Sequence, residues 1–103
     1  MKILAIEHDL PAATAEDFQR HAKAEAARAW ALHQAGIIRE LYFRADRPEA
    51  VLVLESADLA AAQEALSTLP LVQHGLIIFE LIPLTAYPGF ARLFAGQDSP
   101  PGH

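Results

Sequence analysis

Residues 69–84, with the sequence LPLVQHGLIIFELIPL, decide how this chain folds. A strand that exposes one face to water alternates apolar and polar residues. This stretch is apolar at most positions, and Glu80 stands among the apolar residues. We therefore expect a strand that is covered on both faces, with Glu80 close to an apolar surface.

Three other stretches predict strands, and two stretches between them predict helices. The strands are expected at residues 2–8, 37–44 and 49–56, and the helices at residues 15–35 and 59–68. The order is then βαββαβ, which predicts an α+β fold of the ferredoxin-like type. Such a fold has a four-stranded antiparallel sheet with both helices on one face.

The ends of both helices are marked in the sequence. Thr14 and Asp17 have the spacing of a capping box before the first helix, and Gly36 supplies its end. Ser56 or Asp58 can cap the second helix. That helix is expected to end at Pro70, which cannot continue it.

Composition limits the classes of function. The chain has 103 residues with a net charge of -5 and only 8 Lys and Arg, which argues against nucleic-acid binding. It has no cysteine, so disulfides and thiolate chemistry are excluded. No apolar run approaches the about 20 residues of a membrane span, so we expect a cytoplasmic protein. Residues 1–94 are expected to form one domain, and the polar residues 95–103 a flexible tail.

Side-chain alternation assigns each strand residue to one face of the sheet. If the turn at residues 45–48 sets the register, Tyr42 lies opposite Val51 and Glu40 opposite Val53. The face toward the helices is then expected to hold Leu4, Ile6, Ile37, Arg39, Leu41, Phe43, Leu52, Leu54, Ile77, Phe79 and Leu81. The other face is expected to hold Ile3, Ala5, Glu7, Ile38, Glu40, Tyr42, Val51, Val53, Glu55, Ile78, Glu80 and Ile82.

The second of these faces is too apolar to remain in water. The simplest cover is a second copy of the chain, so we expect a homodimer or a higher homo-oligomer in which two sheets enclose a space. The glutamates of that face would line the space. Alternatively, several of them lie at the sheet ends in solvent, because buried acids are rare.

Two stretches carry a resemblance to a known family. They are LHQAGIIRELYFR at residues 32–44 and TLPLVQHGLIIFELIPLTAYP at residues 68–88. With the βαββαβ order, they make the chain similar to the muconolactone isomerase family, whose members are dimeric α/β barrels. The resemblance implies proton transfer on a small unsaturated lactone or aromatic-derived acid, without a cofactor. It also implies lysines in the first helix, where this chain has Ala22 and Ala26 and only Lys23 nearby.

Such an isomerisation needs a general base and a donor to the developing enolate oxygen. Glu80, Glu40 or Glu55 is the candidate base, and Tyr42 or His74 is the candidate donor. The candidate substrate-binding residues are Glu7, His74 and Glu25.

Other readings of these residues remain open. His21, Glu25 and Arg28 share one stripe of the first helix, where a solvated charge pair is the alternative to a pocket mouth. No metal-binding spacing such as HExxH occurs, so no metal is expected. The competing function is a non-catalytic homo-oligomer that binds a small ligand or only assembles.

Overall fold

The computed structural model describes residues 1–94. The predicted tail, residues 95–103, lies outside this part. Four strands form one sheet: β1 (Lys2–Asp9), β2 (Ile38–Phe43), β3 (Ala50–Glu55) and β4 (Ile77–Leu84). The helices are α1 (Ala15–Gln34), α2 (Leu59–Leu66), α3 (Pro70–Gln73), the 3₁₀ helix η1 (Pro88–Phe90) and α4 (Ala91–Phe94).

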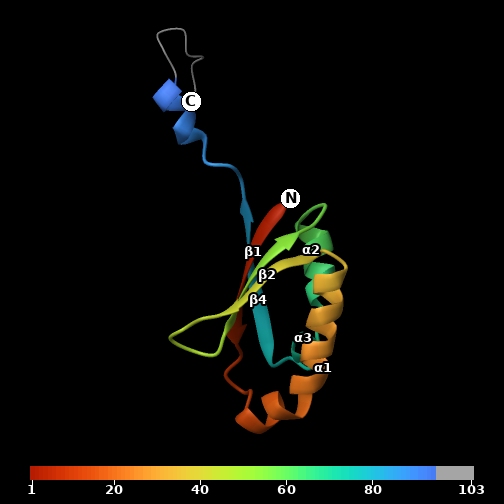
Figure 1. Ribbon diagram of the computed structural model, residues 1–103. Coiled ribbons are helices and arrows are strands. Elements are labelled where there is room, and N and C mark those ends of the chain that lie inside the picture. The colour runs from red at the N-terminus through yellow and green to blue at the C-terminus, as the bar shows by residue number, and fades with distance from the viewer. Residues whose placement is uncertain (95–103) are drawn as a thin grey trace.

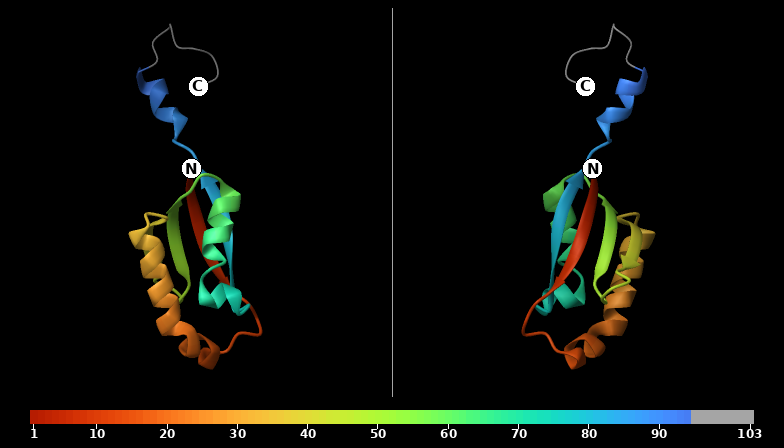
Figure 2. Two further views of the ribbon diagram at one scale, coloured as in Figure 1. Left: turned by 90° about the vertical axis from the view of Figure 1, so that its right-hand side faces the viewer. Right: turned by 90° about the vertical axis from the view of Figure 1, so that its left-hand side faces the viewer.

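The strand order is β2-β3-β1-β4, and every neighbouring pair is antiparallel. Figure 1 shows α1 and α2 on the same side of the sheet, and the left view of Figure 2 shows strands of the sheet between the two helices. The predicted ferredoxin-like α+β fold is confirmed. The core lies between the sheet and the helices and includes Ile3, Leu52, Leu54, Leu66 and Leu69.

The predicted caps form. Thr14 accepts a hydrogen bond from the Asp17 backbone, and the Asp17 side chain accepts one from the Thr14 backbone, which completes the capping box of α1. Gly36 follows the helix with a φ of 80°, a left-handed conformation that favours glycine. Asp58 caps α2 by accepting from the Ala61 backbone.

The predicted faces of β1 are wrong. Ile3 and Ala5 are fully buried in the core, and Glu7 is only 5% exposed. These three side chains lie beneath the helices, and Leu4 and Ile6 lie on the other face. Because β1 has branched aliphatic residues in both alternating sets, the residues of β1 alone do not predict which face is buried.

The hairpin register is as predicted, but β2 contains an irregularity. Tyr42 pairs with Val51 and Glu40 with Val53, whereas Ile38 pairs with Leu54, so the register shifts between Ile38 and Glu40. An extra residue in one strand reverses the alternation on its far side. Ile38 therefore enters the core, 1% exposed, and its predicted position on the outer face is wrong.

Residues 69–84 do not form one continuous strand. Pro70 does not simply end α2, since it starts α3 at a position where its missing N–H costs nothing. Gly75, with a φ of 71°, then turns the chain into β4. In β4 itself the assignment is correct, because Ile77 and Phe79 pack on the core side and Ile78 and Glu80 are exposed.

The chain beyond β4 leaves the body. Residues 85–94 stand away from the sheet and its helices in Figure 1, and we call them the arm. The arm exposes large apolar side chains, with Phe90 66% and Phe94 85% exposed. Within residues 1–94, no helix has the length and apolar character needed to cross a membrane.

Candidate active site

A pocket of about 570 Å³ lies between α1 and the sheet. The side chains that α1 presents to it are mostly small, and the alanines leave the space that larger residues would fill. The sheet side is apolar apart from two acids. The lining includes Phe18, Gln19, Ala22, Glu25, Ala26 and Ala29 from α1, and Glu7, Asp9, Ile38, Leu41, Phe43, Ala50, Leu52 and Phe79 from the sheet.

Glu25 enters the pocket from α1. Its Oε1 accepts a hydrogen bond of 2.9 Å from the backbone N–H of Leu71 in α3. Burial raises the pKa of Glu25, and the Leu71 hydrogen bond opposes this effect. Glu25 is therefore a partly desolvated carboxyl that is held in place and is more basic than an ordinary glutamate.

Glu7 enters the same pocket from β1, on the opposite wall. Its Oε1 accepts a hydrogen bond of 3.0 Å from the Ala50 backbone N–H. Burial, a hydrogen bond with Asp9 and the charges of Asp9 and Glu49 raise the pKa of Glu7 to about 8. The hydrogen bond from Ala50 offsets only part of this shift. Glu7 therefore carries a proton at neutral pH.

Glu49, a neighbouring acid, pairs with two arginines that lie outside the pocket. Glu49 is 7% exposed, and one of its oxygens lies 3.3 Å from Arg47 Nε and 3.7 Å from an Arg44 nitrogen. Its other oxygen accepts from the Asp9 backbone. Neither arginine lines the pocket.

The sequence and the fold have counterparts among known proteins. A family model described as muconolactone delta-isomerase matches residues 3–89. The chain belongs to this family. A crystal structure of muconolactone isomerase shares the fold, with a TM-score of 0.70 and 21% sequence identity over 85% of this chain and 92% of that one. No curated protein matches the sequence.

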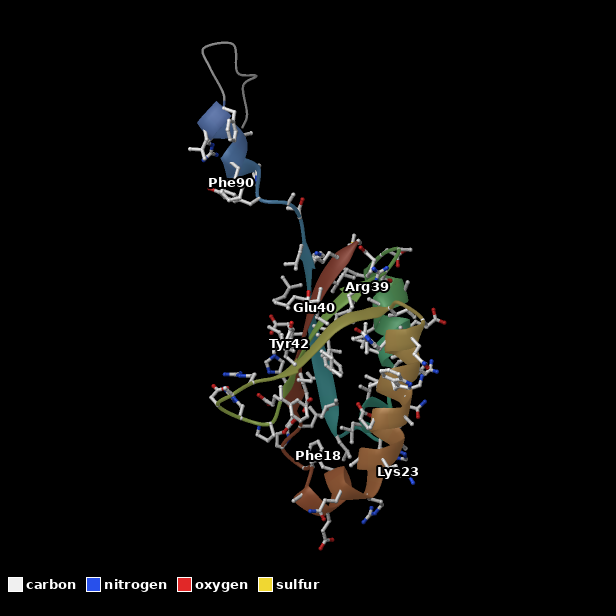
Figure 3. All side chains as sticks on the ribbon, in the orientation of Figure 1. Phe18, Lys23, Arg39, Glu40, Tyr42 and Phe90 are labelled. Carbon is white, nitrogen blue, oxygen red and sulfur yellow. The ribbon has the colours of Figure 1, made fainter. Side chains whose placement is uncertain are left out.

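Because the chain belongs to the muconolactone delta-isomerase family, the residues that α1 has in place of the implied lysines are informative about its pocket. The resemblance implied lysines near Ala22 and Ala26, and both alanines line the pocket. Lys23, the nearest lysine, is exposed and lies on the outer side of α1, as Figure 3 shows. Phe18 lies between α1 and the sheet in the same view.

The four residues predicted to be catalytic lie on the outer face of the sheet, which we define as the face away from α1 and α2. Glu40 and Tyr42 point away from the helices in Figure 3, and Tyr42 Oη donates to Glu40 Oε1 at 2.7 Å. This hydrogen bond raises the pKa of Tyr42. Glu80 instead pairs with His8, whose Nε2 lies 3.0 Å from Glu80 Oε1.

Within one chain, Tyr42 and Glu80 lie on the two edge strands of the sheet. The pairs Tyr42–Val51, Val51–Ile6 and Ile6–Glu80 form one row across the four strands. Three strand spacings of about 4.8 Å place Tyr42 and Glu80 about 14 Å apart. One chain therefore brings the predicted donor Tyr42 to the candidate base Glu40 but not to the candidate base Glu80.

Glu55 and His74 lie apart from the Tyr42–Glu40 pair and from the His8–Glu80 pair. Glu55 Oε2 is 2.8 Å from the N-terminal ammonium group, and the hydrogen bond from that group lowers the pKa of Glu55. His74 stacks on His21 with ring centroids 4.0 Å apart, at the contact between α3 and α1. Of the predicted substrate-binding residues, Glu7 and Glu25 line the pocket and His74 does not.

Sequence reasoning missed the pocket wall of α1. Ala22, Ala26 and Ala29 follow an i, i+4, i+7 spacing, with Glu25 on the same stripe. A stripe of alanines around one acid on the inner face of a helix was the available signal. The incorrect assignment of the β1 faces placed Glu7 on the outer face. The sequence therefore did not predict that Glu7 and Glu25 line the same pocket.

Proposed function

We propose that the pocket between α1 and the sheet performs a cofactor-independent proton transfer on a small unsaturated lactone or a related carbonyl compound. The observation that carries this proposal is the pair of carboxyl groups on opposite walls of one apolar pocket. Family membership supports an isomerase-type reaction. A cytoplasmic location stays a prediction from the sequence.

The two carboxyl groups suit different roles. Glu25, whose pKa is raised by burial, would in its ionised form remove a proton from a carbon conjugated with the carbonyl group, and the electron pair would move into a dienolate. Return of a proton at another carbon would complete the double-bond shift, with no net change in atoms or electrons. Glu7, protonated at neutral pH, would donate a hydrogen bond to the enolate oxygen in place of the hydrogen bond that it makes with Asp9. Burial raises the pKa of both acids, and desolvated carboxyl groups of this kind are typical of acid–base sites.

The test is turnover of a panel of unsaturated lactones, followed by ultraviolet absorbance. Glu25→Gln keeps the size and the acceptor oxygen for the Leu71 N–H but removes the base, so we expect kcat to fall by about 10² to 10⁴. Glu64→Gln, on the exposed surface of α2, is the matched control and should retain activity.

A different outcome would relocate the chemistry. If Glu25→Gln retains full turnover and Glu80→Gln or Glu40→Gln loses it, the outer face holds the site, as predicted from the sequence. If no variant and no panel member shows turnover, the non-catalytic reading is favoured.

We also propose that the protein is a homo-oligomer. The outer face carries Leu4, Ile6, Val51, Val53, Ile78 and Ile82, and the arm adds exposed aromatic rings. Contiguous apolar surface of this kind is typical of interfaces. This feature supports assembly whether or not the pocket is catalytic.

A further inference from the structure

We propose that the pocket selects an uncharged carbonyl compound and disfavours one that carries a carboxylate. This inference rests on the pocket of the proposed function and names the charge class of its ligand. It is carried by the charges that line the pocket, the use of the backbone N–H groups at its wall, and the positions of the nearest cations.

The charged side chains that line the pocket are all acidic. They are Asp9 and Glu25, joined by Glu7, which is protonated at neutral pH, and no Lys, Arg or His from residues 1–94 is among the lining residues. A ligand carboxylate would therefore meet like charge in an apolar and partly desolvated space. Like charges in such surroundings repel more strongly than they do in water.

The backbone donors that a carboxylate would need are already used. The Ala50 N–H donates to Glu7 at 3.0 Å, and the Leu71 N–H donates to Glu25 at 2.9 Å. The protein's own carboxyl groups thus occupy these two donors. An incoming anion would lose its water without gaining equivalent hydrogen bonds, which is costly.

The cations around the pocket are engaged elsewhere. Arg28 Nε donates to Thr68 Oγ1 at 2.8 Å, and Arg44 donates bidentate hydrogen bonds to the carboxylate of Asp46. Arg20 lies 3.6 Å from an Asp17 oxygen, and Lys23 points outward from α1 in Figure 3. None of these side chains supplies a positive charge to the pocket wall.

An uncharged ligand avoids these costs. Most of the lining is aliphatic or aromatic, which suits a ring with no charge. Because the pKa of Glu7 is about 8, this residue can donate a hydrogen bond to a ligand carbonyl at neutral pH in place of its hydrogen bond with Asp9. The pocket therefore offers the Glu7 hydroxyl and the Gln19 amide as side-chain donors among mostly apolar walls.

The test compares two ligands that differ chiefly in charge. The probes are muconolactone, whose side-chain carboxyl is ionised at neutral pH, and its methyl ester. Binding to the full chain is measured by titration calorimetry, so any group that a second copy contributes is present. We expect the ester to bind at least about tenfold more tightly than the acid.

A pair of lysine variants gives the test its control. Ala22→Lys places a cation on the pocket wall and should strengthen binding of the acid by about tenfold while leaving the ester nearly unchanged. Ala24→Lys makes the same change in net charge on the exposed part of α1 outside the pocket lining, and should change neither affinity. Circular dichroism would verify that both variants fold.

The outcomes separate this inference from the proposed function. Tighter binding of the acid, or equal effects of the two lysines, would overturn the charge preference even if the protein turns the acid over. Preferential binding of the ester without turnover would support the charge preference and count against the catalytic proposal. Absence of binding by both probes to the folded protein would overturn the inference.

Discussion

Glu7 and Glu25 face the same apolar pocket from opposite walls, one from β1 and the other from α1. Each accepts a hydrogen bond from the backbone of a third segment, Ala50 for Glu7 and Leu71 for Glu25. Burial raises the pKa of both. Glu7 comes from β1 and Glu25 from α1, so the pocket that they share is formed only when the helix folds over the sheet.

The first prediction concerns the pH dependence of stability. The pKa of Glu7 is about 8 in the folded protein, against 4.5 for an ordinary glutamate. The folded protein therefore keeps a proton that the unfolded chain releases in this range. This stabilising contribution is fully present below pH 4.5 and is lost as the pH rises toward 8, with a slope of at most about 1.4 kcal/mol per pH unit.

Glu7→Gln tests this prediction, because glutamine stays uncharged and keeps an acceptor for the Ala50 N–H. Between about pH 5 and pH 8, the free energy of unfolding should fall less steeply in the variant than in the parent protein. Urea unfolding at several pH values measures both. The comparison cancels contributions from Asp17, Asp46 and Glu55, whose pKa values are lowered. Parallel curves for the two proteins would contradict the assignment.

The second prediction concerns the space that the alanines of α1 leave. Ala26→Leu should fill part of the pocket with little loss of helix stability, since leucine is also a good helix former. Steric overlap with a ligand costs about 1–3 kcal/mol, so we expect affinity to fall about tenfold or more. Ala27→Leu, one residue along and exposed outside the pocket lining, should leave the affinity unchanged. Similar losses in both variants would place the ligand elsewhere.

Much of the fold could be predicted because its local signals agree. Thr14 with Asp17 marks where α1 begins, Gly36 marks its end, and the turn before Glu49 sets the hairpin register. Each signal acts over a few residues, so it can be recognised without tertiary structure. Family membership then agrees with the predicted order of elements.

The candidate site was harder to predict because it depends on which face of each strand packs against the helices. The set Ile3, Ala5 and Glu7 and the alternating set Leu4 and Ile6 are both compatible with a core. Only contact with the helices distinguishes them. The irregularity in β2 likewise reverses the side of Ile38, and it follows from pairing with β3 rather than from any local motif.

The third prediction concerns the outer face. Ile78 is 51% exposed, so Ile78→Arg should cost a single chain little stability. In a homo-oligomer that buries this face, the arginine would be an unpaired buried charge costing about 3 kcal/mol or more. We therefore expect the dissociation constant, measured by sedimentation, to rise at least about a hundredfold. Ala24→Arg on α1 is the control, and equal association of both variants would exclude this face as the interface.

The fourth prediction concerns the arm. Tyr87 and Phe90 pack edge to face with ring centroids 5.0 Å apart, and Gly89 lies against the Tyr87 ring so closely that an added Cβ would clash with it. The arm thus has a defined local structure, although its apolar side chains are exposed. A segment with these properties is expected to pack against a second copy.

Deletion of every residue after Leu84 should therefore weaken association without unfolding the body, because β4 and the core end before the arm begins. Sedimentation measures the first effect and circular dichroism the second. Gly89→Ala provides a milder change: it disturbs the packing of Tyr87 but keeps the apolar residues, and should raise the dissociation constant by less than the deletion does. If the shortened chain associates as tightly as the full one, the arm does not contribute to the interface, and the outer face alone must account for assembly.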